Sequence, residues 1–303
     1  MFKTLLGKFR EADIVRKYIF ANVTIYIILL LIGVFSVLLN QRALAAEVGA
    51  WIELPASLPQ LLQRPWTVVT YMFVHGSLWH ILWNMLALHV FGRIYLELFS
   101  TRHFVGTYLL GGLFGALFFV LAYNLFPYFE NVVNTAHLVG ASAAVLAIVV
   151  AAAVRSPEYR INLLLVGSVK LSTFAVVTVL ISVLMLSGDN AGGNFAHLGG
   201  ALAGFLFAFL LGKGFDITDV VNRPIDWVKS LFSGKLFKRK KKSKFTYTAG
   251  GKREADYEYN ARKKRSEAEI DAILEKIKKG GYASLSEDEK KRLFNASSNK
   301  VQN

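Results

Sequence analysis

The sequence predicts an all-α polytopic membrane protein: a bundle of six transmembrane helices followed by a cytoplasmic polar helical tail. Hydrophobic residues make up 54% of the 303 residues. They are concentrated between residues 18 and 213, whereas Lys, Arg and Glu are abundant in the remainder. The apolar region contains six stretches of the roughly 20 residues that a helix needs to cross a bilayer core about 30 Å thick. These stretches are residues 18–40, 78–98, 102–125, 137–155, 169–187 and 193–213.

The first stretch follows a basic N-terminal arm, residues 1–17. The arm lacks the short apolar region and small-residue cleavage site of a removable signal peptide, so we expect the first helix to be a retained signal anchor. The sequence leaves the start of the fifth stretch open, because Arg160 and Lys170 flank an apolar run that could begin earlier. With these boundaries, the six-helix membrane domain is predicted to span residues 18–213.

The charges of the loops predict the orientation of this domain. Lys and Arg in short loops favour the cytoplasmic side of a membrane. They occur in the N-terminal arm, at Arg93 and Arg102 around the next turn, at 155–160 and in the tail, whereas 126–136 and 187–196 contain neither. We therefore expect a multi-pass protein of the bacterial cytoplasmic membrane with both termini in the cytoplasm.

This orientation brings three polar residues to one depth. The second, fourth and sixth helices begin on the outer side, and Asn84, Ser142 and His197 each lie within the first two turns of one of them. At 1.5 Å per residue, two turns correspond to roughly 10 Å. Because ionisable and polar groups are costly at bilayer depth, these residues are candidates for function.

Ser142 and His197 are the only pair in the chain that makes a plausible nucleophile and base. A serine hydroxyl attacks a peptide carbonyl when a neighbouring base removes its proton, and imidazole has a suitable pKa for that step. We predict that His197 takes the Ser142 proton and later delivers it to the departing amine. No Asp or Glu lies in the fourth or sixth stretch to orient the imidazole, so the expected arrangement is a dyad rather than a triad.

The oxyanion formed in such a reaction needs preorganised hydrogen-bond donors. His80 and Asn84 are four residues apart and therefore share one face of the second helix. Together with the backbone N–H of Ser142, they are the candidate donors.

Simpler interpretations apply to each feature taken alone. A serine in a transmembrane helix often donates a hydrogen bond to the carbonyl four residues earlier, and the glycine pairs 111/115 and 200/204 fit close helix packing. A metal site formed by His75, His80 and His137 is conceivable. However, no HExxH motif or nearby carboxylate supports it, so neither a metal nor another cofactor is expected. The absence of Cys excludes disulfides and cysteine nucleophiles.

Over residues 60–213, roughly half of the chain, these motifs resemble those of the rhomboid family of intramembrane serine proteases. The family pattern of a His, a second His five residues later and an Asn four residues beyond is met by His75, His80 and Asn84. The Gly-x-Ser element is met by Gly140 and Ser142. The resemblance implies a six-helix rhomboid-like bundle that cleaves transmembrane protein substrates.

The Ala-His-x-x-Gly-x-x-x-Gly element of the family is met by the stretch that contains His197, Gly200 and Gly204. The resemblance assigns the catalytic dyad to Ser142 and His197, as the chemistry already indicates. It assigns the second His and the Asn of the upstream motif to the oxyanion site, and gives the first His and the motif glycines supporting roles.

The sequence departs from the family pattern at three places. Ala143 follows the nucleophile where Gly is common, which adds a methyl group where the fourth and sixth helices are expected to pack closely. Trp66-Thr67 replaces a Trp-Arg pair, and Leu146 replaces an aromatic residue that stacks on the catalytic His. A rhomboid-like pseudoprotease that binds membrane clients is the main alternative, although inactive relatives usually lose the Ser or the His. A transporter is less favoured, because the helices show no buried acidic residue and no inverted repeat.

The resemblance also implies a route for the substrate. Residues 41–75 form a long loop whose Trp51 and Trp66 favour the membrane interface, and the family equivalent is embedded in the membrane. The fifth helix corresponds to the proposed lateral gate. We expect a single-pass client to enter sideways and unwind near its outer end, which is costly because unfolded backbone in lipid leaves polar groups unsatisfied.

The tail is predicted to have three parts. Residues 214–244 form a basic amphipathic juxtamembrane segment that we expect to bind anionic lipid head groups; nucleic acid is not an expected partner, because no recognition fold is present. Residues 245–266 are expected to be a linker. Residues 267–303 form a small helical tail, in which Gly280-Gly281 ends one helix and Ser286-x-x-Glu289 is a capping box for a second.

Overall fold

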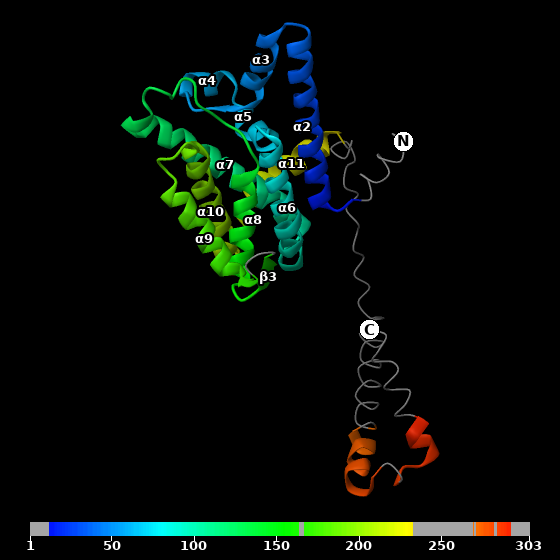
Figure 1. Cartoon of the computed structure of the whole chain (residues 1–303). Helices are drawn as coiled ribbons and strands as arrows, with labels where there is room; N and C mark the ends of the chain where they lie inside the picture. Colours follow the sequence, from blue (N-terminus) through cyan, green and yellow to red (C-terminus); the bar gives the residue numbers. More distant parts are fainter. Residues whose placement is uncertain (1–11, 164–166, 233–268, 270, 282–283, 292–303) are drawn as a thin grey trace, which may run out of the picture. The chain divides into compact units, whose positions relative to one another are not determined.

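The structure, a computed structural model, describes residues 12–163, 167–232, 269, 271–281 and 284–291 (Figure 1). The chain forms two compact units, Met1–Phe237 and Lys238–Asn303. Helices dominate the described part of the first unit, and six of them occupy the six predicted stretches. These helices are α2 (Ile14–Leu38), α6 (Leu78–Leu98), α7 (Thr101–Leu125), α8 (Ser142–Arg155), α9 (Leu171–Leu184) and α10 (Ala191–Gly212).

Three of these helices, α2, α7 and α10, are long and apolar enough to cross a membrane. The helices α8 and α9 are apolar but have only 14 residues each, and α6 has 21 residues that include several polar side chains. The described residues therefore support a membrane protein with three candidate spans. The crossing of a membrane by all six helices stays a prediction.

Side-chain caps fix the starts of three helices. The Asp13 carboxylate accepts from the Arg16 backbone N–H at 2.8 Å before α2. The hydroxyl oxygens of Ser77 and Ser100 accept from the backbone N–H groups three residues later, at 3.1 and 3.2 Å, before α6 and α7. These contacts satisfy N–H groups that have no partner within their own helix, so the local sequence determines where each helix begins.

The fourth predicted helix starts later than the sequence indicates. Residues 137–155 were the expected range, but α8 begins at Ser142, because His137–Leu138 forms a short strand, β2. This strand pairs antiparallel with β1 (Leu54–Pro55), and Leu54 lies opposite Leu138. His137 is therefore part of a strand before α8 rather than a residue at the start of the helix.

The fifth helix is also shorter than expected. A hairpin of β3 (Arg160–Leu163) and β4 (Gly167–Lys170) precedes α9 and pairs antiparallel. The described chain is mostly helical, as predicted, and also contains two short sheets of two strands each.

The long loop before α6 has ordered helical structure. It contains α3 (Arg42–Ile52), α4 (Leu58–Gln63), α5 (Thr67–Thr70) and a 3₁₀ turn at Tyr71–Phe73. The rings of Trp51 and Trp66 stack at 5.5 Å between centroids, and Trp66 Nε1 donates to the Trp51 carbonyl oxygen at 2.8 Å. These contacts join α3 to the segment before α5 through two aromatic residues that are predicted to lie at the membrane interface.

Small residues allow α8 and α10 to approach closely. A Cβ atom added at Gly200 would lie 2.1 Å from the Ala143 carbonyl oxygen, and one added at Gly204 would lie 2.2 Å from the Ala147 carbonyl oxygen. Both contacts are with backbone atoms, which cannot move aside as a flexible side chain can. The close packing predicted from this glycine pair is confirmed.

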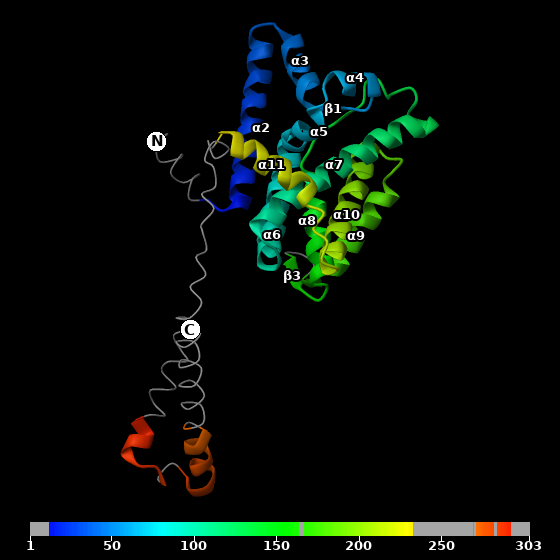
Figure 2. The same cartoon turned by 180° about the vertical axis from the view of Figure 1, so that it is seen from behind.

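The views from both sides show α6 between α2 and α8 (Figures 1 and 2).

A second glycine pair, Gly111 and Gly115, allows α7 to approach α8 closely. A Cβ atom added at Gly111 would lie 2.4 Å from the Ala147 Cβ, and one added at Gly115 would lie 2.6 Å from the Ala143 Cβ. The methyl group of Ala143 therefore faces α7. The sequence placed it between the fourth and sixth helices, whereas the Ala143 atoms nearest to Gly200 of α10 belong to the backbone.

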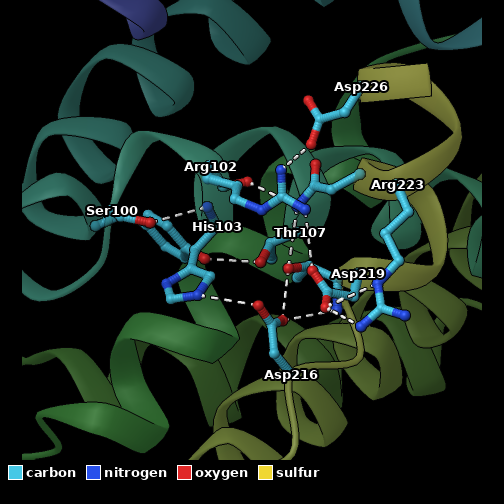
Figure 3. Close-up of polar contacts among 11 residues, drawn as sticks. Ser100, Arg102, His103, Thr107, Asp216, Asp219, Arg223 and Asp226 are labelled. Carbon is cyan, nitrogen blue, oxygen red and sulfur yellow. Dashed lines mark hydrogen bonds and ion pairs between the residues drawn. The ribbon is translucent and has the colours of Figure 1, made fainter. Parts of the chain in front are cut away.

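The helix α11 (Asp219–Phe232) lies in the predicted juxtamembrane segment and binds the start of α7 through its polar face (Figure 3). The Arg102 guanidinium pairs with Asp226 and, at 3.0 Å, with Asp219. Arg223 also pairs with Asp219, at 2.8 Å. Hydrogen bonds from Arg102 and Arg223 hold the pKa of Asp219 below its usual range.

Two further contacts attach the segment around α11 to α7. His103 Nε2 lies 3.2 Å from the Asp216 carboxylate (Figure 3), and the buried Asn222 side chain donates to the Arg102 carbonyl oxygen at 3.1 Å. A Cβ atom added at Gly106 would lie 2.3 Å from the Cβ of Thr218, so the two backbones are close. The juxtamembrane helix is thus held to the membrane domain by polar contacts.

The second unit contains the predicted helix signals. Gly281 has φ of +73°, and its N–H donates to the Ile277 carbonyl oxygen at 2.8 Å, as expected for a glycine that ends a helix. The Ser286 N–H donates to the Glu289 carboxylate at 2.7 Å, and the Glu289 N–H donates to the Ser286 hydroxyl at 3.3 Å. The capping box is confirmed, whereas the predicted linker, 245–266, and the end of the second helix lie outside the described residues.

Replacing Gly200 with Ala should separate α8 from α10, because the new methyl group meets the Ala143 backbone. We expect overpacking to lower the free energy of unfolding by roughly 1–3 kcal/mol, measured by thermal unfolding in detergent. Gly212→Ala is the matched control on the same helix, since a Cβ atom added there meets nothing within 4 Å. Equal unfolding temperatures for the two variants would contradict this close packing of α8 and α10.

Candidate active site

A glycine with left-handed backbone geometry places Ser142 at the first residue of α8. Gly140 has φ of +122°, which other residues adopt only with strain. Its N–H donates to the Tyr71 carbonyl oxygen at 3.0 Å. Because Ser142 begins the helix, its hydroxyl lies beside backbone N–H groups that have no helical partner. This end of a helix stabilises negative charge.

The Ser142 hydroxyl oxygen lies 2.8 Å from Nε2 of His197, although the two residues are 55 positions apart in the chain. His197 is in the second turn of α10, three residues before Gly200. Both side chains are partly exposed, so a reactant can reach them. The predicted contact between the hydroxyl and the imidazole is present, and its role in catalysis stays a prediction.

A second serine contacts the other side of the imidazole. The Ser182 hydroxyl oxygen of α9 lies 3.2 Å from Nδ1 of His197 and 3.1 Å from the Thr178 carbonyl oxygen. Ser182 is 2% exposed, although most of α9 faces outward. Both nitrogens of the His197 ring therefore have a hydroxyl partner.

His80 lies beside the loop that holds Ser142. A Cβ atom added at Gly140 would lie 2.7 Å from His80 Nε2, so only glycine leaves room for this ring. The imidazole of His80 also lines an open cavity of about 340 Å³, together with His137 and Asp189. The cavity gives water a space next to the candidate site.

The structure brings Asn84 and His75 less directly to Ser142. Asn84 is buried and its Nδ2 donates to the His80 carbonyl oxygen of the same helix at 2.9 Å. The ring of His75 packs against that of His80 at 5.1 Å, and its two nitrogens make no hydrogen bond with the described residues. Among these residues, no group of three or more His, Asp or Glu side chains is arranged to hold a metal ion.

Sequence reasoning missed two polar residues near the site, Ser182 and Asn194. Asn194 is buried on α10, and its Nδ2 donates to the Met185 carbonyl oxygen just after α9 at 2.8 Å. Each is a polar residue inside an apolar stretch, which is the signal that could have selected it. Ser182 also follows Thr178 by four residues, as expected for a helical serine that donates to the preceding turn.

Two family models match the chain. A family of unknown function, DUF6576, matches residues 253–299, a range that begins inside the segment predicted as a linker. No curated protein matches the chain. The model of the rhomboid domain matches residues 62–214, half of the chain, and this range includes all of the helices and loops that carry Ser142, His197, His80 and Asn84. The chain therefore belongs to the rhomboid family.

Proposed function

We propose that this rhomboid is an intramembrane serine endopeptidase that cleaves transmembrane protein substrates near the outer membrane face. The observation that carries the proposal is the 2.8 Å contact between the Ser142 hydroxyl oxygen and His197 Nε2. A serine hydroxyl within hydrogen-bonding distance of an imidazole is the arrangement that general-base activation of a nucleophile requires. Its position at a helix N-terminus favours the negative charge that develops during the reaction.

The chemistry follows from this contact. His197 Nε2 takes the hydroxyl proton as Ser142 Oγ bonds to the scissile carbonyl carbon, which forms a tetrahedral oxyanion. The imidazolium then protonates the leaving amine as the C–N bond breaks. Water attacks the resulting ester with His197 again as the base, and the proton returns to Ser142 as the acid product departs.

Three donors are proposed for the oxyanion. The Ser142 backbone N–H is at the start of α8, and the His80 ring lies beside Gly140. Asn84 Nδ2 donates to the His80 carbonyl oxygen, so this amide would exchange an intrahelical bond for the oxyanion during the reaction. Such an exchange favours the transition state, because the stronger acceptor is present only then.

The packing of α9 supports the proposal that the substrate enters sideways. Only three of its residues, Leu171, Ala175 and Ser182, are buried, so this helix contributes less packing than α8, whose side chains are mostly buried. The orientation proposed from the loop charges, with both termini in the cytoplasm, puts the start of α8 on the outer side. A transmembrane client would then be cut near its outer end.

The alternative is a rhomboid-like protein that binds membrane clients without cutting them. It requires a surface that binds the client but not the contact between Ser142 and His197. The protease is favoured because a chain that only binds has no need of a hydroxyl and an imidazole at 2.8 Å.

A fluorophosphonate probe should label the detergent-solubilised protein at Ser142. Labelling is expected to disappear in Ser142→Ala and His197→Ala, because one variant removes the nucleophile and the other its base. His89→Ala is the control, since His89 is a partly exposed histidine on α6 and is not a hydrogen-bond partner of Ser142 or His197. Absence of labelling in the wild type, with client binding unchanged by both substitutions, would favour the binding protein instead.

Removing either proposed oxyanion donor should slow cleavage of a labelled transmembrane substrate. We expect Asn84→Ala and His80→Ala each to lower kcat by about 10²–10³-fold, the usual effect of losing one such donor. Steady-state cleavage in reconstituted bilayers measures this effect. A change in KM alone, with kcat unchanged, would show that these side chains bind substrate but do not stabilise the oxyanion.

We further propose that the juxtamembrane segment 214–244 lies on a membrane surface that contains anionic lipid. The polar face of α11 is held by Arg102, so its other face is left exposed. That face carries large apolar side chains, namely Val220, Trp227, Val228 and Leu231. The basic block at 233–244 lies outside the described residues. An exposed apolar stripe next to basic residues is typical of helices that bind at the lipid interface.

The chain contains no Cys, so single cysteines can report the depth of α11. In bilayers with anionic lipid, an environment-sensitive fluorophore on Leu231→Cys should shift to shorter wavelength and be quenched by spin-labelled lipid. The same fluorophore on Lys229→Cys, which lies on the other face of the helix, should stay in water. Identical quenching at the two positions, or quenching that is unaffected by lipid charge, would contradict this proposal.

A further inference from the structure

The imidazole of His197 lies between two serine hydroxyls that belong to different helices. Ser142 Oγ is 2.8 Å from Nε2, and Ser182 Oγ is 3.2 Å from Nδ1. Ser182 is 2% exposed. Its hydroxyl also lies 3.1 Å from the Thr178 carbonyl oxygen, one turn earlier in α9. The four groups form a continuous chain of hydrogen bonds.

The donors and acceptors of this chain can be arranged in two directions. In the first, Ser182 donates to the Thr178 carbonyl, Nδ1–H donates to Ser182, and Ser142 donates to Nε2. In the second, Ser182 donates to Nδ1 and Nε2–H donates to Ser142. The carbonyl oxygen can only accept, whereas a neutral imidazole carries one donor and one acceptor, so these two tautomers are the alternatives.

The first direction satisfies one more donor. In it, all three hydrogens of Ser142, His197 and Ser182 have acceptors. In the second, the Ser142 hydroxyl hydrogen has no acceptor among the described residues, because His197 is the only hydrogen-bond partner of that side chain there. Since a polar hydrogen without an acceptor is unfavourable in a partly buried contact such as this one, the first direction is preferred. It is also the one that leaves Nε2 free to take the Ser142 proton.

We propose that Ser182 is a positioning residue that holds His197 in the Nδ1–H tautomer with Nε2 directed at Ser142. The Ser182 hydroxyl occupies the place that a carboxylate fills in a triad, but it belongs to α9 rather than to either helix of the dyad. The inference deepens the proposed function and rests on it for the effect on rate. The tautomer itself is a property of the resting protein.

The size of the effect follows from the neutrality of the hydroxyl. A carboxylate both orients an imidazole and stabilises its positive charge, whereas a hydroxyl oxygen supplies one neutral hydrogen bond. We therefore expect Ser182→Ala to lower kcat by about 3- to 10-fold with little change in KM. Ser182→Thr retains a hydroxyl that can donate to the Thr178 carbonyl, so it should restore most of the loss.

The matched control is Ser172→Ala. Ser172 is on the same helix and its hydroxyl also donates to a carbonyl, that of Pro157, at 2.8 Å. This variant removes the same kind of group from α9 without touching His197. Its kcat should equal that of the wild type.

The tautomer can be measured without turnover. Imidazole ¹⁵N chemical shifts in histidine-labelled protein separate protonated from unprotonated ring nitrogens. The chain has six histidines, and a His197→Gln sample identifies the signals of His197. At a pH where the ring is neutral, we expect protonated Nδ1 and unprotonated Nε2 in wild type, and a mixture of tautomers in Ser182→Ala.

The outcomes separate this inference from the proposed function. An active wild type with an Nε2–H tautomer, or a Ser182→Ala variant with unchanged tautomer and kcat, would overturn the role of Ser182 and leave the protease intact. A wild type that neither reacts with the probe nor cleaves, but carries the Nδ1–H tautomer that Ser182→Ala disturbs, would overturn the protease and leave the positioning role standing. The wild-type tautomer tests the inference even where a variant fails to fold.

Discussion

The close approach of α8 and α10 is the constraint on which the candidate site depends. The carbonyl oxygens of Ala143 and Ala147 lie where side chains at Gly200 and Gly204 would otherwise be. His197 precedes these glycines by three and seven residues, so it shares their face of α10. Ser142 directly precedes the first of the two alanines. The same register that packs the two backbones therefore brings the hydroxyl and the imidazole to 2.8 Å.

The hydrophobic effect contributes little to such packing between helices in a membrane. Lipid tails are as apolar as the helix surfaces, so helix association in a membrane depends on close van der Waals contact and on hydrogen bonds. Gly111 and Gly115 of α7 supply the same kind of contact to α8 from another side. The methyl group of Ala143 occupies the space opposite Gly115. The position after Ser142 thus takes part in packing against α7, which explains how an alanine is accommodated there without pushing α10 away.

Features that depend on local sequence were predictable. The six helices follow from hydrophobic composition, and the capping box at Ser286 and Glu289 follows from residues three apart. The start of α8 was not predictable, because it depends on a strand pair between Leu54 and Leu138, which are far apart in the chain. An apolar run that includes residue 137 looks helical until its partner strand is known.

The candidate site likewise has one feature that was predictable from the sequence and one that was not. The contact between Ser142 and His197 was predictable because each residue lies near the start of an apolar segment, and the loop charges predict that both segments start on the same side. Ser182 was not, since the one signal that it carries, a polar residue inside an apolar stretch, is shared by Ser172 and Thr178 of the same helix. All three hydroxyls contact backbone carbonyl groups. Only the packing of α9 against α10 determines which of them meets an imidazole.

Through its contact with His197, Ser182 connects the imidazole ring to α9, a helix with few buried residues. Two polar contacts connect the C-terminal part of α9 and the residue just after it to α10: Ser182 to His197 at 3.2 Å and the Met185 carbonyl to Asn194 at 2.8 Å. If a substrate enters past α9 as proposed, displacing this end of the helix would break both of them. His197 would then lose the proposed acceptor for Nδ1–H, so the movement that admits a substrate would also weaken the orientation of the imidazole. In the proposed mechanism, a productive complex would therefore either return α9 to its place around the bound segment or supply a substitute acceptor from the substrate backbone.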